Sequence, residues 1–276
     1  MSEYVIANAT VVPVRENLSE GAEQLTQLLF GEVCEVLDRL PRWTKIRSTL
    51  DGQEGWVDFK MVTLTSEPSE QLALRVLNAP VVATPMAAAT SMDGGADLLL
   101  TLGTRLPNYS HGTFEVLGQQ YLIDPTCVST AQRSTSETDL QQSDLQRSDL
   151  ATIAQSLLNA PYLWGGKNLM GMDCSGFTQV VYAAMGVYLL RNAREQMTQG
   201  ELVSSLAEAQ PGDLAFFDHA DRDPKATNIS HVGLLLSPTE IIHCSGCVHI
   251  DTIDEQGIHL PDGELTHHLV QIKRYL

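Results

Sequence analysis

The sequence has few cysteines, few basic residues and no long apolar run. Its five cysteines are odd in number and scattered, which argues against a disulfide framework and fits a reducing compartment; they are Cys34, Cys127, Cys174, Cys244 and Cys247. Against 34 Asp and Glu there are 17 Lys and Arg, a formal net charge of −17, and no basic cluster that would bind nucleic acid. No stretch approaches the roughly 20 apolar residues of a membrane span. We therefore expect a monomer with neither a nucleic-acid nor a membrane partner.

The first residues, Met1 to Ile6, contain no basic segment followed by an apolar run and a small-residue cleavage site. This start predicts a cytoplasmic protein, or a secreted or periplasmic one if a signal peptide has been removed.

The front half of the chain predicts two small β-barrels. Residues 1–66 contain short β-branched and aromatic runs at about ten-residue spacing, separated by turn sequences such as Asp51-Gly52. Residues 67–130 repeat this plan in a degenerate form, since Val81–Pro85 echoes Val11–Val14.

The back half predicts a different kind of domain. Residues 131–149 are rich in Ser, Thr, Gln and Asp and are interpreted as a linker, after which Ser148 or Asp149 caps a helix that runs to Leu158. Residues 150–276 mix helical and strand patterns, which indicates an α+β domain.

Cys174 is the leading candidate nucleophile. Apolar residues from Phe177 to Met185 recur at helical spacing, and Gly186 is a suitable stop, so Cys174 lies at a helix start. Unpaired N–H groups there stabilise a thiolate. The alternative is a small buried core residue, the usual fate of a free cysteine. The flanking glycines, Gly165, Gly166 and Gly176, favour the first interpretation because they let the backbone approach a ligand.

Two histidines are candidates for the base and its partner. Residues 230–236 and 240–244 predict a hairpin in which His231 opens the first strand and His243 lies on the second. If the two side chains face each other, His243 can orient His231. A zinc site is the competing chemistry, with the ligands His243, Cys244, Cys247 and His249. Neighbours on a strand point to opposite faces, so no metal is expected. The remaining histidines are interpreted as surface or loop residues: His111, His219, His259, His267 and His268.

These residues resemble the NlpC/P60 cysteine peptidases over the last 120 or so residues. The matching segments, in order, are Tyr162–Gly166, Met172–Phe177, Gln210–Phe217 and Ser230–Leu234, with His243 at the third triad position. The front half resembles the paired bacterial SH3 domains of the branch that acts on L-Ala-γ-D-Glu-diamino acid peptides during murein recycling. The resemblance implies a papain-like α+β domain behind two SH3-like barrels, with no cofactor and a small murein peptide as substrate.

Carried over, the resemblance implies Cys174 as nucleophile, His231 as general base and then acid, and His243 as the orienting residue. Tyr162 would place its hydroxyl near the oxyanion, which the backbone N–H groups at Cys174 and Ser175 would also face. The full implied substrate-binding set is Tyr162, Trp164, Asp173, Ser175, Arg191, Asn192, Glu23 and Gln53.

Two departures from the family pattern bear on specificity. Asn192 stands where relatives that require a free N-terminal amine carry Asp, and Gln53 stands where an aromatic residue is usual, while Glu23 remains as a carboxylate for the amine. An amidase or acyltransferase with another substrate, or a non-catalytic peptide-binding relative, are therefore alternatives to the γ-D-glutamyl–diamino acid endopeptidase. The polar segment 218–229 is either a surface loop or a substrate cover.

Overall fold

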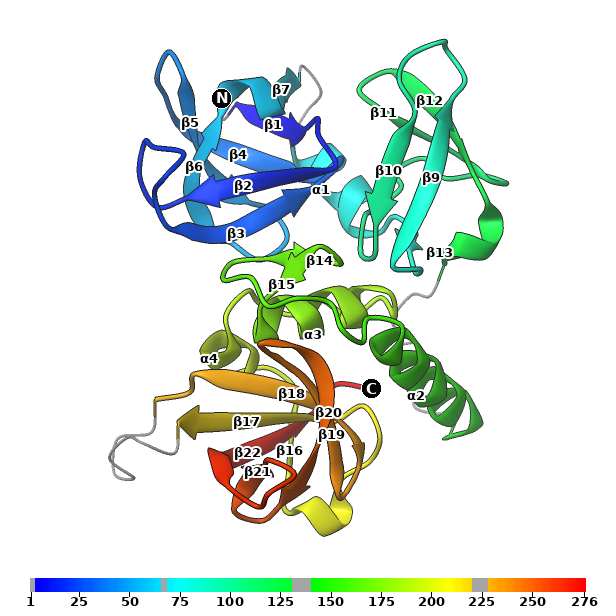
Figure 1. Ribbon diagram of the computed structural model, residues 1–276. Helices are drawn as coiled ribbons and strands as arrows, with labels where there is room; N and C mark the ends of the chain where they lie inside the picture. The colour runs from blue at the N-terminus through cyan, green and yellow to red at the C-terminus, as the bar shows by residue number, and fades with distance from the viewer. Residues whose placement is uncertain (1–2, 66–68, 131–139, 220–227) are drawn as a thin grey trace.

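The computed structural model describes residues 3–65, 69–130, 140–219 and 228–276. Two small β units lie side by side above a larger unit that holds most of the helices (Figure 1). Residues 131–139 of the predicted linker and most of the predicted loop before His231, residues 220–227, lie outside the described residues.

The first unit is one seven-stranded antiparallel sheet in the order β3-β2-β6-β5-β4-β1-β7. Alternating burial explains it: in β2 the side chains of Val12 and Val14 point into the core and their neighbours point outward. The strands expected from sequence are confirmed here. Their bounds are β1 Tyr4–Ala7, β2 Val11–Arg15, β3 Gln24–Leu29, β4 Val33–Arg39, β5 Trp43–Ser48, β6 Glu54–Asp58 and β7 Val62–Thr65, with a 3-10 turn at Phe59–Met61.

The second unit is smaller and differs in layout. Helix α1 (Ser69–Leu77) leads into it, and its sheet has the order β10-β9-β12-β11, with β8 and β13 forming a separate pair. The bounds are β8 Val81–Val82, β9 Met86–Ser91, β10 Leu98–Thr101, β11 Thr113–Val116, β12 Gln119–Ile123 and β13 Val128–Ser129, with a 3-10 turn at Pro125–Cys127. That this unit is a second SH3 domain stays a prediction.

Helix α2 spans Leu140–Gln155, so the predicted helix start at Ser148 or Asp149 is wrong and the helix begins at Leu140. That residues 131–149 link the units stays a prediction. The sequence from residue 140 to 158 contains no glycine or proline to stop a helix, and the polar residues simply continue it. Arg147 fixes this helix to the last unit, because its guanidinium donates to the carbonyl of Pro211 at 3.0 Å.

The last unit is a seven-stranded antiparallel sheet in the order β16-β22-β17-β18-β19-β20-β21, which closes on itself because β21 also pairs with β22. Helix α3 (Cys174–Ala183) packs against β18 and β19. The other elements are β14 Lys167–Asn168, β15 Gly171–Met172, α4 Ala193–Gln196, β16 Glu201–Val203, β17 Leu214–His219, β18 His231–Ser237, β19 Glu240–Ser245, β20 Cys247–Asp254, β21 Gly257–His259 and β22 Leu265–Arg274, with a 3-10 turn at Leu206–Glu208. Helices and an antiparallel sheet in one unit agree with the predicted α+β class.

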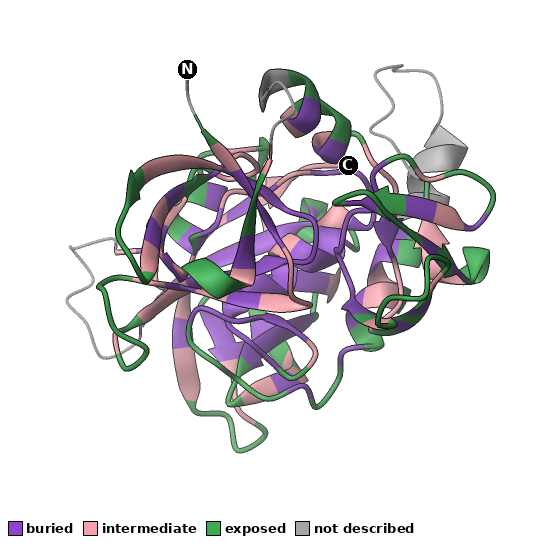
Figure 2. Cartoon of the chain, turned by 90° about the horizontal axis from the view of Figure 1, so that it is seen from above, coloured by how far each residue is buried: buried purple, intermediate pink, exposed green. Residues whose placement is uncertain are grey.

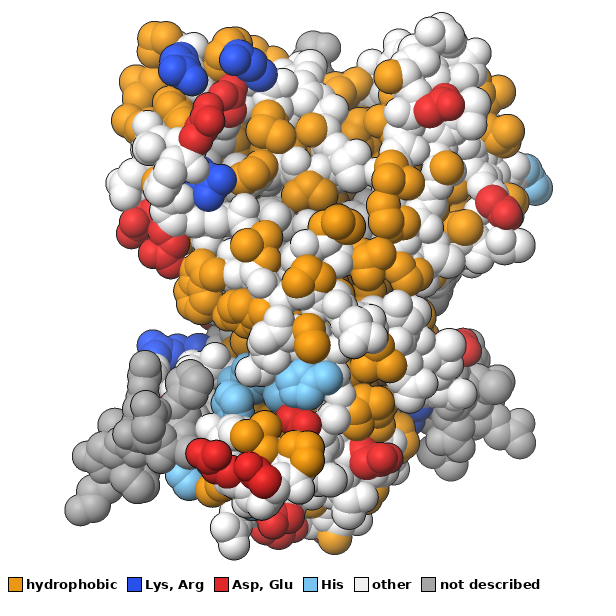
Figure 3. Space-filling view, in the orientation of Figure 1, with side chains coloured by type: hydrophobic (Ala, Val, Ile, Leu, Met, Phe, Trp, Pro, Cys, Tyr) orange, Lys and Arg blue, Asp and Glu red, His pale blue; other side chains and the backbone are white. Residues whose placement is uncertain are grey.

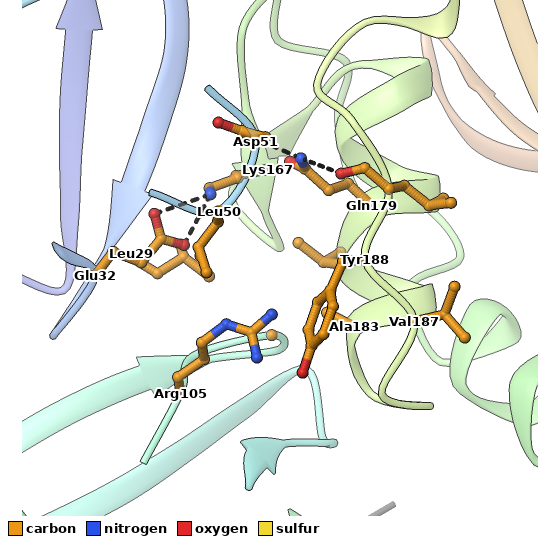
Figure 4. Close-up of a pocket in the computed structure, with 13 residues that line it drawn as sticks. Leu29, Glu32, Leu50, Asp51, Arg105, Lys167, Gln179, Ala183, Val187 and Tyr188 are labelled. Carbon is orange, nitrogen blue, oxygen red and sulfur yellow. Dashed lines mark hydrogen bonds and ion pairs between the residues drawn. The ribbon is translucent and has the colours of Figure 1, made fainter. Parts of the chain in front are cut away.

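The first unit is fastened to the last by buried polar contacts. The Lys167 ammonium lies 2.8 Å from the Glu32 carboxylate, and both side chains are less than a tenth exposed (Figure 4). The side-chain carbonyl of Gln27 accepts from the Lys167 backbone N–H and from the Asn168 amide. Across the molecule, buried residues lie in the packed strands and helices, while exposed residues lie mainly in the outer loops (Figure 2).

A cavity of about 30 Å³ lies where the three units meet, lined by Glu32, Arg105, Lys167 and Tyr188 among others (Figure 4). Space of this size holds a water molecule or two and no peptide. A larger cavity of about 320 Å³ lies between the two small units, with neither cysteine nor histidine in its lining. Candidate chemistry is therefore found elsewhere, around Cys174.

Candidate active site

Cys174 is the first residue of α3, as predicted. Asp173 caps the helix: one carboxylate oxygen accepts from the Gly176 N–H at 2.7 Å, and the other accepts from the Gly165 N–H at 2.9 Å. The helix ends at Ala183, two residues earlier than the apolar pattern indicates, and Gly186 then takes a left-handed conformation with φ of 73°.

The glycines around Cys174 serve a different purpose from the one predicted. A Cβ on Gly165 would lie 2.4 Å from the backbone oxygen of Gln24 in the first unit, and one on Gly176 would lie 2.1 Å from the oxygen of Gly166. These residues therefore let protein backbone approach protein backbone, rather than a ligand. They hold the start of α3 tightly against its own loop and against β3.

His231 and His243 face each other across the predicted hairpin. In the β18–β19 pairing His243 stands opposite Gly233, so the side chain of His231, two residues away, projects from the same face of the sheet. The two rings lie nearly perpendicular, and Nε2 of His231 is 2.8 Å from Nδ1 of His243. The assumed facing of these two side chains is confirmed.

The sulfur of Cys174 lies against the backbone on either side of His231. It is 4.0 Å from the carbonyl oxygen of Ser230, and the backbone N–H of Val232 is among the groups that favour its ionised form. The packing of α3 on β18 thus brings the two catalytic candidates together from segments 57 positions apart in the sequence.

The expectation of a thiol held ionised by the helix start is not met. Burial raises the pKa of Cys174 to about 12, and the neighbouring Asp173 carboxylate adds to this rise. The N–H groups of Val232 and Ser175, together with Arg191, act in the opposite direction and are outweighed. The thiol must therefore pass its proton to a base as it reacts.

Three further side chains lie near the histidine pair; Asp251 was missed from the sequence, His249 was considered only as a zinc ligand, and His267 was placed on the surface. The carboxylate of Asp251 lies 3.1 Å from Nε2 of His243 and 3.0 Å from Nε2 of His249. His267, interpreted as a surface or loop residue, is instead buried, with its ring centroid 4.4 Å from that of His231. The available signal was Gly246: a turn centred there pairs His243 directly with His249.

Asp251 accepts a hydrogen bond from His243 and so fixes the position of its ring proton. Burial lowers the pKa of His243 despite the carboxylate beside it, so the ring is neutral near pH 7. Burial also pushes the pKa of Asp251 upward, but the bonds and charges of the two histidines outweigh it and leave that pKa below its usual value. An ionised Asp251 next to a neutral His243 can only accept, which places the His243 proton on Nε2.

Arg191 and Asp173 form a buried ion pair below the nucleophile. The guanidinium of Arg191 is 1% exposed, donates twice to Asp173 at 2.7 and 3.0 Å, and also bonds to Ser175 and to Thr26 of the first unit. Burial alone would lower the pKa of Arg191, yet Asp173 outweighs it and the pKa is raised. Their mutual contacts leave Arg191, Asp173 and the Ser175 side chain as supports of the site, rather than surfaces for a substrate.

The other predicted substrate contacts come from two units; Glu23, Trp164 and Asn192 are exposed, and Gln53 is half-buried. Trp164, 59% exposed, donates its indole N–H to Glu23 at 2.8 Å. The Asn192 amide lies 3.5 Å from the side-chain oxygen of Gln53 and 2.9 Å from the carboxylate of Glu195. The structure therefore groups these residues in two pairs across the junction with the first unit.

Tyr162 forms an isolated bridge to Met172, two residues before Cys174. Burial raises its pKa above the usual value, and the charges of Cys174 and Asp173 add to the rise. Its backbone N–H donates to the oxygen of Gly246 at 2.9 Å. One face of the molecule shows histidine side chains beside apolar side chains, near the junction of the units (Figure 3).

The competing four-ligand zinc site is not formed. Cys244 is fully buried and its sulfur donates to the carbonyl of Met172 at 3.1 Å, on the opposite side of β19 from His243. Within the described ranges, no helix is long and apolar enough to cross a membrane.

Comparison with known proteins gives two domain matches. Residues 159–264 match the NlpC/P60 family, and residues 10–62 match the bacterial SH3 domain. The gamma-D-glutamyl-L-lysine dipeptidyl-peptidase of Bacillus cereus is 28% identical over 79% of this chain and 66% of its own length. The Bacillus subtilis protein of the same name is 27% identical over 79% of this chain and 71% of its own length.

A solved structure of an NlpC/P60 family protein from Bacillus cereus superposes with a TM-score of 0.78, at 20% identity, over 99% of both chains. This likeness extends over all three units and concerns the fold.

Proposed function

We propose that this chain, which carries an NlpC/P60 domain behind a bacterial SH3 domain, is a cysteine peptidase that hydrolyses the γ-D-glutamyl–diamino acid bond of short murein peptides. One observation carries the chemistry: the Cys174 sulfur lies against the backbone of Ser230 and Val232, on either side of His231, and Nε2 of His231 bonds to His243. The similarity to the two Bacillus dipeptidyl-peptidases supports the substrate class. A monomeric state and a cytoplasmic location stay predictions.

The direction of the hydrogen bonds makes His231 a base. Asp251 accepts from Nε2–H of His243, so Nδ1 of that ring carries a lone pair and accepts from Nε2–H of His231. Nδ1 of His231 is then the nitrogen with a lone pair. It takes the Cys174 proton as the sulfur attacks, which a buried thiol with a raised pKa requires.

The reaction that follows is acyl transfer. The sulfur forms a bond to the γ-glutamyl carbonyl carbon, and the tetrahedral oxyanion collapses as His231 returns the proton to the leaving diamino-acid nitrogen. Water, deprotonated by the same ring, then attacks the thioester and releases L-Ala-γ-D-Glu with the thiol restored. Tyr162 and the free N–H groups at the start of α3 are the donors available to the oxyanion.

The first unit supports a preference for short peptides. Glu23 and Gln24 bond to the indole and the carbonyl of Trp164, so β3 stands against the loop that precedes the nucleophile. A wall strand that continued past these residues would have to displace these contacts, whereas a short peptide would not.

The contacts available for a free N-terminal amine leave room for a second candidate function. The side chains of Asn192 and Gln53 are in contact, and both are neutral. Two carboxylates are nearby in the structure or on the same unit: Glu195 accepts from the Asn192 amide, and Glu23 belongs to the same unit as Gln53. This neutral pair favours an amidase or acyltransferase that ignores the amine, as the second candidate. Comparing free-amine with N-acetylated peptides separates the two functions, because indifference to the amine supports the second.

The test of the first candidate uses the full chain and L-Ala-γ-D-Glu-meso-diaminopimelate. The expected product is L-Ala-γ-D-Glu, formed by the wild type and by Cys127→Ala, a cysteine of the second unit, but not by Cys174→Ala. Folded wild-type protein that binds these peptides and converts none of them would instead support a binding protein.

A further inference from the structure

A group of three ligand atoms lies directly behind the proposed catalytic pair. Nε2 of His243, Nε2 of His249 and a carboxylate oxygen of Asp251 are all within 4.8 Å of one another, and the same Asp251 oxygen is 3.1 and 3.0 Å from the two nitrogens. The His243 side chain is 1% exposed and that of Asp251 9%, whereas that of His249 is 32% exposed. The group is thus buried on one side and open to solvent at His249.

The hydrogen bonds of His249 point to a cation. Its Nδ1 lies 2.8 Å from the carbonyl oxygen of Cys247, which can only accept, so Nδ1 carries the proton. In the neutral ring Nε2 then has a lone pair, directed at a carboxylate oxygen 3.0 Å away. Two acceptors at this distance repel unless a second proton or a metal ion lies between them. A ring N–H donated to a backbone carbonyl is also the usual support of a metal-bound histidine.

We propose that His243, His249 and Asp251 form an inhibitory site for a divalent transition metal such as zinc. Bonds of about 2.0–2.1 Å at tetrahedral angles separate neighbouring ligand atoms by about 3.3 Å, close to the two distances observed. Two imidazoles and a carboxylate are a donor set that zinc accepts, with water entering from the exposed side as the fourth ligand. The predicted inhibition rests on the proposed function, whereas the predicted metal binding does not.

Bound metal reverses the hydrogen bonds on which the base depends. The metal takes the lone pair of His243 Nε2, whose proton is lost, so the neutral ring carries its proton on Nδ1. The proton between the rings therefore moves from His231 Nε2 to His243 Nδ1. His231 gains a proton from solvent at Nδ1 and can no longer accept one from Cys174. The metal thus inhibits without touching the nucleophile.

Binding is tested with Zn²⁺ alone and needs no turnover. Calorimetric titration of Cys174→Ala protein should show one ion bound, and adding His249→Gln should weaken that binding by more than about tenfold. The matched control adds His259→Gln, since His259 pairs with Asp254 on the surface of the same sheet and should leave affinity unchanged. Loss of binding in Cys174→Ala itself, or equal affinity after His249→Gln, would overturn the proposal.

Inhibition is tested on the active enzyme. Zn²⁺ should reduce peptide hydrolysis reversibly, with recovery on chelation, and the ratio of rates with and without Zn²⁺ should return towards one in His249→Gln but not in His259→Gln. Co²⁺ bound to the wild type should show a visible spectrum without a thiolate charge-transfer band. Such a band, or undiminished inhibition of His249→Gln, would assign the metal to Cys174 and contradict the proposal. An inactive wild type that binds Zn²⁺ as predicted would refute the proposed function alone.

Discussion

Replacing Asp251 with Asn should slow catalysis while leaving substrate binding intact. The substitution removes a charge-assisted hydrogen bond to His243, of the kind worth about 1.5–3 kcal/mol. The Asn amide can also donate to Nε2 of His243, which places the ring proton on Nδ1 and reverses the bond to His231. At 1.4 kcal/mol per factor of ten, kcat should fall roughly 10- to 150-fold.

The assay is steady-state hydrolysis of L-Ala-γ-D-Glu-meso-diaminopimelate, with thermal unfolding measured in parallel. KM should change little, because Asp251 touches His243 and His249 rather than the proposed site of the substrate. Asp254→Asn is the matched control: Asp254 lies on the same strand, is 56% exposed, and pairs with His259 away from the histidine pair. A correctly folded Asp251→Asn enzyme whose kcat stays within about twofold of the wild type would refute the reasoning on hydrogen-bond direction.

Three further changes test other parts of the structure. His231→Asn should slow the alkylation of Cys174 at neutral pH. The difference in rate between wild type and variant should narrow as pH rises towards the thiol pKa of about 12. Equal rates at pH 7 would show that the His231 ring does not take the proton. Glu32→Gln should lower the free energy of unfolding in urea by about 3–5 kcal/mol, because it leaves the buried Lys167 ammonium without its charged partner. The double variant Glu32→Met with Lys167→Met should recover most of that loss. A single variant as stable as the wild type would contradict the buried pairing. Asn192→Asp should raise kcat/KM for free-amine over N-acetylated peptide by about tenfold, and an unchanged ratio would place the amine elsewhere.

The sequence was most informative where local periodicity decides structure. Apolar spacing after Phe177 placed Cys174 at a helix start, and the Ser237–Thr239 turn brought His231 and His243 onto paired strands. In both cases, neighbours in the chain are enough to specify the element.

It was least informative where distant segments meet. The approach of Gly165 to Gln24 and the contact of His267 with His231 depend on how units and strands pack, which no local pattern contains. The raised pKa of Cys174 is of the same kind, because it follows from burial under the whole fold rather than from position at a helix end. Asp251 is an intermediate case, because a turn predicted at Gly246 would have placed this residue near His243.

The most direct test of the account is to trap the acyl-enzyme. Acid quenching of a rapid reaction with L-Ala-γ-D-Glu-meso-diaminopimelate, followed by peptide mass spectrometry, should find the L-Ala-γ-D-Glu acyl group on Cys174, together with a matching burst of free diaminopimelate. An adduct on another residue, or hydrolysis by Cys174→Ala at the wild-type rate, would contradict the assignment of this sulfur as the nucleophile.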